Sequence, residues 1–458
     1  MGLLKGLFGK SKNKSGGNKV VMIGLDGTPY TMLKELFDKG VMPNLKSLAD
    51  SGTFRRMDSS IPAISAIAWT SFMTGKNPGK HRILGFIDLH KNSYQFKFPN
   101  YSHCASETFW DILGRAGRRS IIINQPSTYP AKEMNGICIA GFVVVDLKKA
   151  VYPPSILPKL EKWGYKDDVE LNKGHDDIDG FISDMFYTLE KRVFSIKRFY
   201  DEEDWDYFQG VITETDRLHH FLFGAFADKT HKYHNTFLEF YRQVDKFIGE
   251  IADRTLDNGT LMLMSDHGFT TIKKEIALNY WLRENGYLKF DKEPPENLAD
   301  ISPESKAFAL DPSRIFINIK GKFPKGSVEP GPEEKRLVAE IVEKCKNMTI
   351  PETGEQIIEA VHTREEAYRG PYVGEAAEII LTPKWHYDIK GTIKKLEFAS
   401  TGNFTGMHTH DDAFFCINTK NIQADRKPDV MDIAPTILNL FGYPGAEDMD
   451  GKTLLMSI

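Results

Sequence analysis

Short apolar runs alternate with longer segments of helical periodicity along most of the chain. The runs are continuous rather than alternating with polar residues, so each predicts a strand buried on both faces of a sheet. Such strands are predicted at residues 19–25, 119–124, 205–213, 259–264 and 413–417. Helices are predicted at residues 30–39, 45–51, 69–73, 107–116, 184–201, 235–255 and 430–441. This alternation favours an α/β fold with a doubly wound, mostly parallel sheet flanked by helices.

The pattern changes between residues 291 and 399. Prolines interrupt short strands there, such as the one predicted at residues 314–319, and a single clear helix is predicted at residues 332–346. We interpret residues 291–399 as an inserted α+β subdomain, or cap. The core is then formed by residues 19–290 and 400–458.

The first residues of the chain are basic. Residues 1–18 carry lysines and no acidic residue, and Gly16 and Gly17 lead into the first strand. We interpret residues 1–18 as a flexible basic leader. The alternative is weak peripheral contact with an anionic membrane surface through the lysines and a few Leu and Phe side chains. No segment approaches the length and apolar character of a transmembrane span.

The net charge and the cysteines bear on the expected class of partner and on the expected cellular compartment. A formal charge of −4 over 458 residues gives no global reason to expect a nucleic-acid polymer as partner. The four cysteines, Cys104, Cys138, Cys345 and Cys416, are widely scattered and form no CxxC pair. We interpret them as reduced core residues and expect a cytoplasmic protein, with peripheral membrane contact as the alternative. The oligomeric state is not predicted.

Acidic residues stand where two of the predicted strands end. Asp26 ends the first strand, and Asp266 with His267 follows the strand at 259–264. Open α/β folds bind ligands at the C-terminal edge of the sheet. Asp and His also provide the oxygen and nitrogen ligands that zinc and similar divalent ions accept. The alternatives are a turn aspartate that caps the next helix at Asp26 and a solvated strand-end turn at Asp266.

A second group of candidate ligands follows the strand at 205–213. Asp216 and His220 are four residues apart, so they lie on one face of a helical turn and suit a single ion. The alternative is a solvated helix face, and His219 points elsewhere, as a supporting or surface residue. His408, in a polar loop before the last strand, is a further candidate ligand, and His410 competes for that role.

Ser65 is the candidate nucleophile. It stands where a helix is predicted to begin, so its hydroxyl and the free backbone N–H groups of the first turn face one point. Such a helix start stabilises phosphate. A hydroxyl held by a metal ion is deprotonated far more easily than a free one. The alternative is an ordinary N-cap. Together the candidates indicate a two-metal site for in-line phosphoryl displacement.

The same residues resemble the type I phosphodiesterase/nucleotide pyrophosphatase family of the alkaline phosphatase superfamily. The resemblance spans residues 19–455 and is carried by residues 24–27, 65–81, 215–220, 265–268, 406–408 and 432–444. It implies an alkaline-phosphatase-like core with two divalent metal ions, usually zinc, with manganese as the alternative. It implies that one ion lies among Asp26, Ser65, Asp266 and His267 and that the other is held by Asp216, His220 and His408. Ser65 would attack phosphorus to give a phospho- or nucleotidyl-serine, which water then hydrolyses.

Four positions depart from the pattern of that family, one of them Arg82, which stands where relatives often have a glycine. Ser65 stands where most members have threonine, which is a chemically sound replacement. Ala68 stands where nucleotide pyrophosphatases carry an asparagine that donates to the phosphoryl oxygen, and this puts nucleotide specificity in doubt. Asp412 replaces a glycine expected four residues after His408.

The expected function is metal-dependent hydrolysis of a phosphodiester or pyrophosphate bond in a small-molecule, lipid or nucleotide phosphate ester. Two alternatives keep the core and change the reaction, namely a phosphoglycerate-mutase-like phosphotransferase and a head-group phosphotransferase. A non-enzyme alternative is a degenerate protein that binds a phosphorylated ligand, but the complete set of candidate ligands argues against it. The physiological substrate is not predicted. Specificity is expected to lie in the cap and in the loop at residues 84–103.

Overall fold

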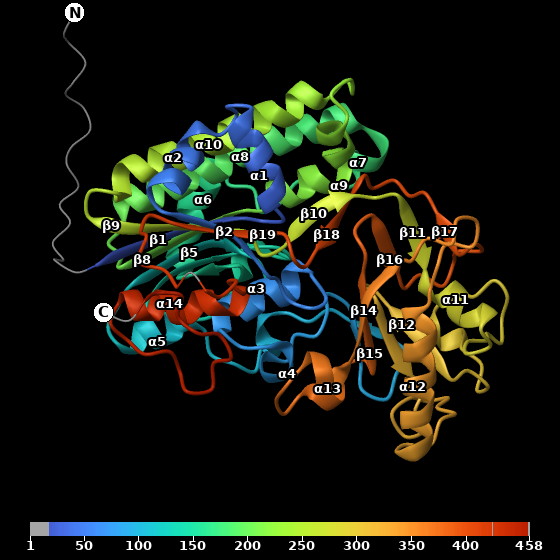
Figure 1. The fold of residues 1–458 in the computed structure, drawn as a ribbon. Coiled ribbons are helices and arrows are strands. Elements are labelled where there is room, and N and C mark those ends of the chain that lie inside the picture. Colours follow the sequence, from blue (N-terminus) through green and yellow to red (C-terminus); the bar gives the residue numbers. More distant parts are fainter. Residues whose placement is uncertain (1–17, 424, 457–458) are drawn as a thin grey trace, which may run out of the picture.

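An eight-stranded sheet lies at the centre of the core, in the strand order β2-β19-β9-β1-β8-β5-β6-β7 (Figure 1). The computed structural model describes residues 18–423 and 425–456. The strands are β1 (Lys19–Leu25), β2 (Thr53–Met57), β5 (Ser120–Gln125), β6 (Gly136–Ala140), β7 (Val151–Tyr152), β8 (Tyr207–Ile212), β9 (Gly259–Met264) and β19 (Ala413–Ile417). Neighbouring strands from β9 to β6 are parallel, whereas β19 and β7 run antiparallel to their neighbours. The predicted doubly wound, mostly parallel sheet is confirmed.

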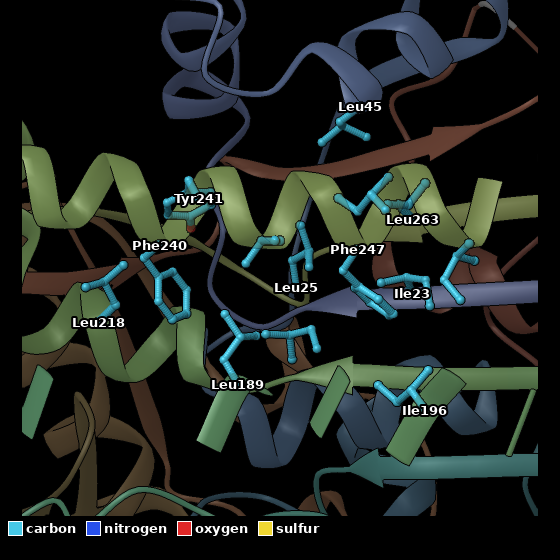
Figure 2. Close-up of a cluster of buried hydrophobic side chains, with 14 of the residues drawn as sticks. Ile23, Leu25, Leu45, Leu189, Ile196, Leu218, Phe240, Tyr241, Phe247 and Leu263 are labelled. Carbon is cyan, nitrogen blue, oxygen red and sulfur yellow. The ribbon is translucent and has the colours of Figure 1, made fainter. Parts of the chain in front are cut away.

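Helices cover both faces of this sheet (Figure 1). One face carries α1 (Tyr30–Asp38), α2 (Pro43–Ser51), α8 (Ile178–Glu202), α9 (Glu214–Ala227) and α10 (His234–Thr255), and the other carries α3 (Ser65–Thr74), α5 (Phe109–Arg115) and α14 (Ile433–Leu440). Successive residues of a strand point to opposite faces. Ile23 and Leu25 of β1 therefore join the first hydrophobic cluster, where Figure 2 shows them beside Phe247 of α10, whereas Val20 and Met22 join the second.

Helix α3 packs closely on the end of β1. A Cβ atom at Gly24 would lie 2.5 Å from the ring of Trp69, so only glycine leaves room for this fully buried indole. The close contact holds the beginning of α3 above the C-terminal end of β1, which is where Ser65 and Asp26 lie.

A further hydrophobic cluster lies beside the core. It is built on the sheet β12-β13-β15-β14 and on the sheet β16-β11-β17. Its elements are β11 (Lys274–Ala277), α11 (Leu278–Glu284), β12 (Ala307–Leu310), β13 (Arg314–Ile317), α12 (Pro332–Lys346), β14 (Ile358–Thr363), β15 (Ile379–Pro383), β16 (Tyr387–Lys390) and β17 (Ala399–Ser400). Ile276 and Leu282 belong to this cluster, so it includes residues before 291. The interpretation of residues 291–399 as an inserted cap stays a prediction.

Arg314 joins this part of the chain to the loop that follows α4 (Pro78–His81). Its side chain is buried and donates to the backbone oxygens of Leu84, at 3.1 Å, Ile87 and Asp311. A Cβ atom at Gly85 would lie 2.4 Å from the guanidinium, so the loop follows the arginine closely. The contact fixes the loop that carries Phe86.

The structure differs from the predicted elements in a few places. His408 lies in a short strand, β18 (Gly406–Thr409), which pairs antiparallel with β10 (Gly268–Thr271), so its assignment to a loop was wrong. Helix α3 begins at Ser65, as predicted for that residue, so the helix predicted at residues 69–73 is longer at its N-terminal end. Helix α8 begins earlier than predicted, because the Asp177 side chain caps it by accepting from Gly180 N–H at 2.9 Å.

Two predictions concern membranes. The proposed basic leader at residues 1–18 falls almost entirely outside the described part of the chain. Among residues 18–423 and 425–456, none of the helices combines the length and the apolar character needed to cross a bilayer.

Candidate metal centre

The residues predicted to form the site meet at the C-terminal edge of the central sheet. Asp26 directly follows β1, Ser65 opens α3, Asp216 and His220 lie in the first two turns of α9, Asp266 and His267 follow β9, and His408 lies in β18. The parallel strands β1, β8 and β9 are neighbours, so the side chains that follow them come together at one edge.

The first ligand group consists of Asp26, Asp266 and His267. Their candidate ligand atoms all lie within 4.8 Å of one another, and all three side chains are buried. His267 Nε2 lies 3.4 Å from Asp266 Oδ2 and 3.7 Å from Asp26 Oδ1. The Ser65 hydroxyl joins this group, with its Oγ 3.3 Å from Asp26 Oδ1 and 3.2 Å from His267 Nε2.

Neighbouring groups hold each of these ligands in position. Trp69 Nε1–H donates to Asp26 Oδ2 at 3.0 Å, and Gly27 N–H donates to Asp266 Oδ1 at 3.0 Å. His267 Nδ1 lies 3.0 Å from the backbone oxygen of Gly268, so a proton on Nδ1 leaves the lone pair of Nε2 for an ion. Each ligand thus has one polar atom engaged and one turned toward the shared space.

Positive charge offsets the burial of these carboxylates only in part, since the charge of Arg217 acts on Asp26 but does not outweigh the effect of burial on its pKa. Asp266 Oδ2 is buried and has no hydrogen-bond partner within the described chain. Burial raises the pKa of Asp266 to about 7, and the charge of Asp216 adds to the effect. Burial and the charges of Asp266 and Asp216 raise the pKa of Asp26 as well. Buried carboxylates facing one another favour either a proton or a cation between them.

The second ligand group consists of Asp216, His220 and His408, whose candidate ligand atoms also lie within 4.8 Å of one another. His408 Nε2 lies 3.2 Å and His220 Nε2 3.5 Å from Asp216 Oδ1, which is buried and has no hydrogen-bond partner in the described residues. The two Nε2 atoms are 3.1 Å apart. Burial lowers the pKa of His220 to about 4, so its imidazole is neutral at pH 7, the form that binds metal. His408 Nδ1 lies 2.9 Å from the Ala63 backbone oxygen.

The two ligand groups are adjacent. His267 Nε2 of the first lies 4.0 Å from Asp216 Oδ1 of the second, and the rings of His267 and His408 stack with centroids 3.8 Å apart. Two-metal sites place their ions about 3.5–4 Å apart. The geometry is therefore compatible with a pair of ions that share one substrate.

Arg217 and Asp168 support the second group and were not found by sequence reasoning. Arg217 Nη1 donates to Asp216 Oδ2 at 2.8 Å, which leaves Oδ1 for the imidazoles. Asp168 accepts from Arg217 Nε at 3.2 Å and from Nη2 at 2.8 Å. Such a bidentate pair fixes the plane of the guanidinium. Asp168 lies in a loop far from α9 in sequence, and no motif points to it.

His219 and His410 lie outside the two ligand groups. His219 is fully buried, with Nδ1 2.9 Å from Gly27 O and Nε2 2.8 Å from the Tyr241 hydroxyl, so it supports the turn after β1 and does not lie on the surface. His410 lines the neighbouring pocket, while His408 joins the ligand group.

A pocket of about 400 Å³ opens beside Ser65 and the second ligand group. Its wall combines residues 61–66 and 404–410 of the core with residues 311–313 and 381–390. The pocket therefore lies where the site meets the segment predicted to be a cap.

Comparison with known proteins identifies the family to which this chain belongs. An α/β sheet with two groups of Asp and His candidate ligands beside a serine is typical of metal-dependent phosphoryl-transfer enzymes. The sequence profile of the family "Type I phosphodiesterase / nucleotide pyrophosphatase" matches residues 20–411. The chain belongs to this family and is a phosphoric ester hydrolase of the phosphodiesterase/nucleotide pyrophosphatase type. A comparison with curated protein sequences found no match.

Solved structures with the same fold are distant in sequence. Phosphonoacetate hydrolase from Sinorhizobium meliloti 1021, in complex with phosphonoformate, has a TM-score of 0.62 at 15% identity, over 94% of this chain and 96% of that one. Human ectonucleotide pyrophosphatase/phosphodiesterase 5 has a TM-score of 0.56 at 13% identity, over 96% of this chain and 100% of that one. These similarities confirm the predicted alkaline-phosphatase-like fold, and the family match confirms the resemblance.

Proposed function

We propose that the protein hydrolyses a phosphodiester or pyrophosphate bond with two divalent metal ions and with Ser65 as the nucleophile. The observation that carries this proposal is the pair of buried carboxylate oxygens without partners in the described chain, Asp266 Oδ2 and Asp216 Oδ1, each facing imidazole nitrogens beside the Ser65 hydroxyl. The first ligand group with Ser65 would hold one ion, and the second group the other.

The donor set fits zinc, with manganese as the alternative. It offers three carboxylates and three imidazoles, and oxygen and nitrogen donors of this kind suit either metal. When bound, such ions lower the pKa of a coordinated hydroxyl or water and neutralise charge on the phosphoryl oxygens.

The residues around Ser65 are arranged for attack on phosphorus. Its hydroxyl donates to Asp26 Oδ1, which orients Oγ toward the ligand groups. The first hydrogen bond at the beginning of α3 runs from Ile67 N–H to Ile64 O at 3.0 Å, so the preceding N–H groups of Ser65 and Ala66 face the start of the helix. These groups suit a phosphoryl oxygen. Attack forms the Ser65 O–P bond and breaks the bond to the leaving group, and water then breaks the O–P bond.

Three further inferences belong to the same proposal. The pocket wall at residues 311–313 and 381–390 supports a role for residues 291–399 as a cap that selects the substrate. The four cysteines are unpaired, which supports a reducing, cytoplasmic compartment. The solved structure of an inactive variant of murine ectonucleotide pyrophosphatase/phosphodiesterase 5 is a complex with AMP. This chain has Ala68 where nucleotide pyrophosphatases carry an asparagine, which argues against nucleotide specificity here.

Turnover of bis-p-nitrophenyl phosphate tests the proposal. We expect Ser65→Ala to lower kcat by at least about 1,000-fold, because the covalent step is lost, and Ser65→Thr to keep measurable activity. Ser71→Ala is the matched control, since Ser71 lies in the same helix but its Oγ is 3.0 Å from His81 Nε2. Full activity in Ser65→Ala would overturn the nucleophile, and full activity after removal of divalent metal by a chelator would overturn the metal site.

A further inference from the structure

The pocket beside Ser65 has mainly apolar walls. Its apolar lining includes Ile64, Phe86, Phe142, Leu381, Ile389 and Phe404. A volume of about 400 Å³ is in the range that binds one small organic group. The group of the substrate that enters this pocket is therefore stabilised chiefly by the burial of apolar surface.

The basic side chains of the pocket are already paired. Arg217 and Lys390 are the Arg and Lys side chains among the described lining residues. Arg217 is held by Asp216 and Asp168, and Lys390 Nζ lies 2.6 Å from Asp388 Oδ2. A second phosphate on the substrate would have to compete with these carboxylates, so the pocket is poorly suited to a polyanionic group.

The aromatic side chains of the pocket are stacked on each other. The rings of Phe86 and Phe142 are nearly parallel, at 6°, with centroids 5.5 Å apart, which is direct contact. A planar base does not fit between them. The guanidinium of Arg217 lies 4.2 Å from the centroid of Phe142 and engages that ring further.

Exposed apolar residues neighbour two aromatic residues of the pocket, Phe86 in space and Phe142 in sequence. Phe98 packs edge-on against Phe86 at 6.1 Å and is 59% exposed. Val143 and Val145 follow Phe142 and are 41% and 82% exposed. Isolated exposed apolar residues are common, but a group of them that adjoins an apolar pocket marks a site of interaction.

We propose that the substrate is a phosphodiester in which one ester group is a long hydrocarbon chain. The phosphate lies at Ser65 and the ligand groups, and the chain runs through the pocket toward Phe98 and Val143. This inference rests on the proposed function and names its substrate class. It commits to an amphiphilic ester rather than a nucleotide.

A series of p-nitrophenyl alkyl phosphodiesters tests the substrate class. The methyl, butyl and octyl esters are compared below their critical micelle concentrations with the p-nitrophenyl ester of thymidine 5′-monophosphate. We expect kcat/KM to rise about twofold to fourfold for each methylene that the pocket buries, and the nucleotide ester to fall below the octyl ester.

Two results would overturn the inference without affecting the proposed function. These are an equal kcat/KM along the alkyl series and a preference for the nucleotide ester, provided that Ser65→Ala stays inactive on every substrate. If Ser65→Ala retained full activity, the proposed function itself would fail. The two failures are therefore distinguishable.

Variants of the pocket locate the effect. Phe86→Ser should lower the octyl-to-methyl ratio of kcat/KM by at least about fivefold, because a polar group replaces apolar contact. Phe98→Ser, at a more exposed position, tests the same chain path if Phe86→Ser folds poorly. Phe194→Ser on α8 is the matched control, since Phe194 is an exposed phenylalanine, at 42%, outside the pocket. An unchanged ratio in both pocket variants would contradict the proposed path.

Discussion

At the scale of single residues, the direction of the Asp216 carboxylate depends on Arg217, which is not itself a candidate metal ligand. Arg217 occupies Oδ2, so Oδ1 faces His220 and His408. Asp168 in turn holds the guanidinium through two hydrogen bonds. Residues that orient a metal ligand in this way commonly change metal affinity or activity by about 10–100-fold when they are mutated.

The substitution Asp168→Asn tests this chain of contacts. Without the charge of Asp168, Asp216 is the carboxylate that remains paired with Arg217. The guanidinium then neutralises more of the Asp216 charge, so less negative charge is available to an ion at the second group. We expect the zinc affinity of the weaker site to fall by about 10–100-fold, measured by competition with a chromophoric chelator. Asp167→Asn is the control, because Asp167 uses its backbone oxygen, which accepts from Arg192. Equal affinity in Asp168→Asn and the wild type would refute the role.

The sequence pattern predicted the candidate ligands that follow strands, but it did not predict the residues that hold those ligands in position. Asp26 and Asp266 are readable because buried apolar runs end directly before them, and Asp216 and His220 because a helix places positions four apart together. The pair Arg217 and Asp168 is formed by a tertiary contact that no spacing encodes. The ligand roles themselves stay predictions.

At the scale of elements, short strands were harder to predict than long ones. Strand β18 has four residues, with His408 the one that is not fully buried, and it pairs with β10, which is equally short. Strand β2 (Thr53–Met57) contains two arginines and lies at the edge of the sheet, so it lacks the apolar run of β1 or β9. A strand that is buried on both faces has a continuous apolar run that can be recognised in the sequence, whereas an edge strand lacks such a run.

The turn before η6 (Val430–Asp432) makes stability depend on pH. Asp429 Oδ1 accepts from Met431 N–H at 2.9 Å, and the turn is tied to Asp58 through Val430 N–H. Burial raises the pKa of Asp429 to about 7, and the charges of Asp432 and Asp58 add to this effect. The raised pKa means that folding opposes ionisation, so the free energy of unfolding should fall as the pH rises from about 4 to about 7.

Asp429→Asn should remove this dependence while keeping the cap, because the amide oxygen still accepts from Met431. At pH 8 we expect the variant to unfold at a higher urea concentration than the wild type, by at least about 1 kcal/mol, and at pH 4 we expect the two to converge. The exposed Asp425→Asn serves as control. A variant less stable than the wild type at pH 8 would show that the charged form is favoured by folding.

At the scale of the whole molecule, the site is shared between the central sheet and the segment that follows it. The core provides both candidate ligand groups and Ser65 at the C-terminal edge of the central sheet, and residues 311–313 and 381–390 contribute to the pocket. Arg314 ties these parts together through the backbone oxygens of Leu84, Ile87 and Asp311. The alternation of strands and helices predicted the sheet, but this cross-connection is formed by tertiary contacts such as those of the buried Arg314 and of the Tyr368 hydroxyl, which donates to Ile61 O at 2.8 Å.

Arg314→Ala should loosen that connection. The change leaves buried carbonyl oxygens without donors and opens a cavity, so we expect the free energy of unfolding to fall by about 2–5 kcal/mol. Limited proteolysis should then cut the loop around Phe86 faster. Arg336→Ala, at an exposed position of α12, is the control. A wild-type rate of cleavage in Arg314→Ala would contradict this account.

The number of metal ions per chain tests the central claim most directly. Native mass spectrometry of the protein, saturated with zinc and then freed of excess metal, should show two ions per chain. His267→Ala changes the first ligand group and His220→Ala changes the second. Each variant should retain one ion, because each loses a ligand from only one of the two groups. A wild-type chain that holds no ion, or a count that neither variant changes, would contradict the two-metal site.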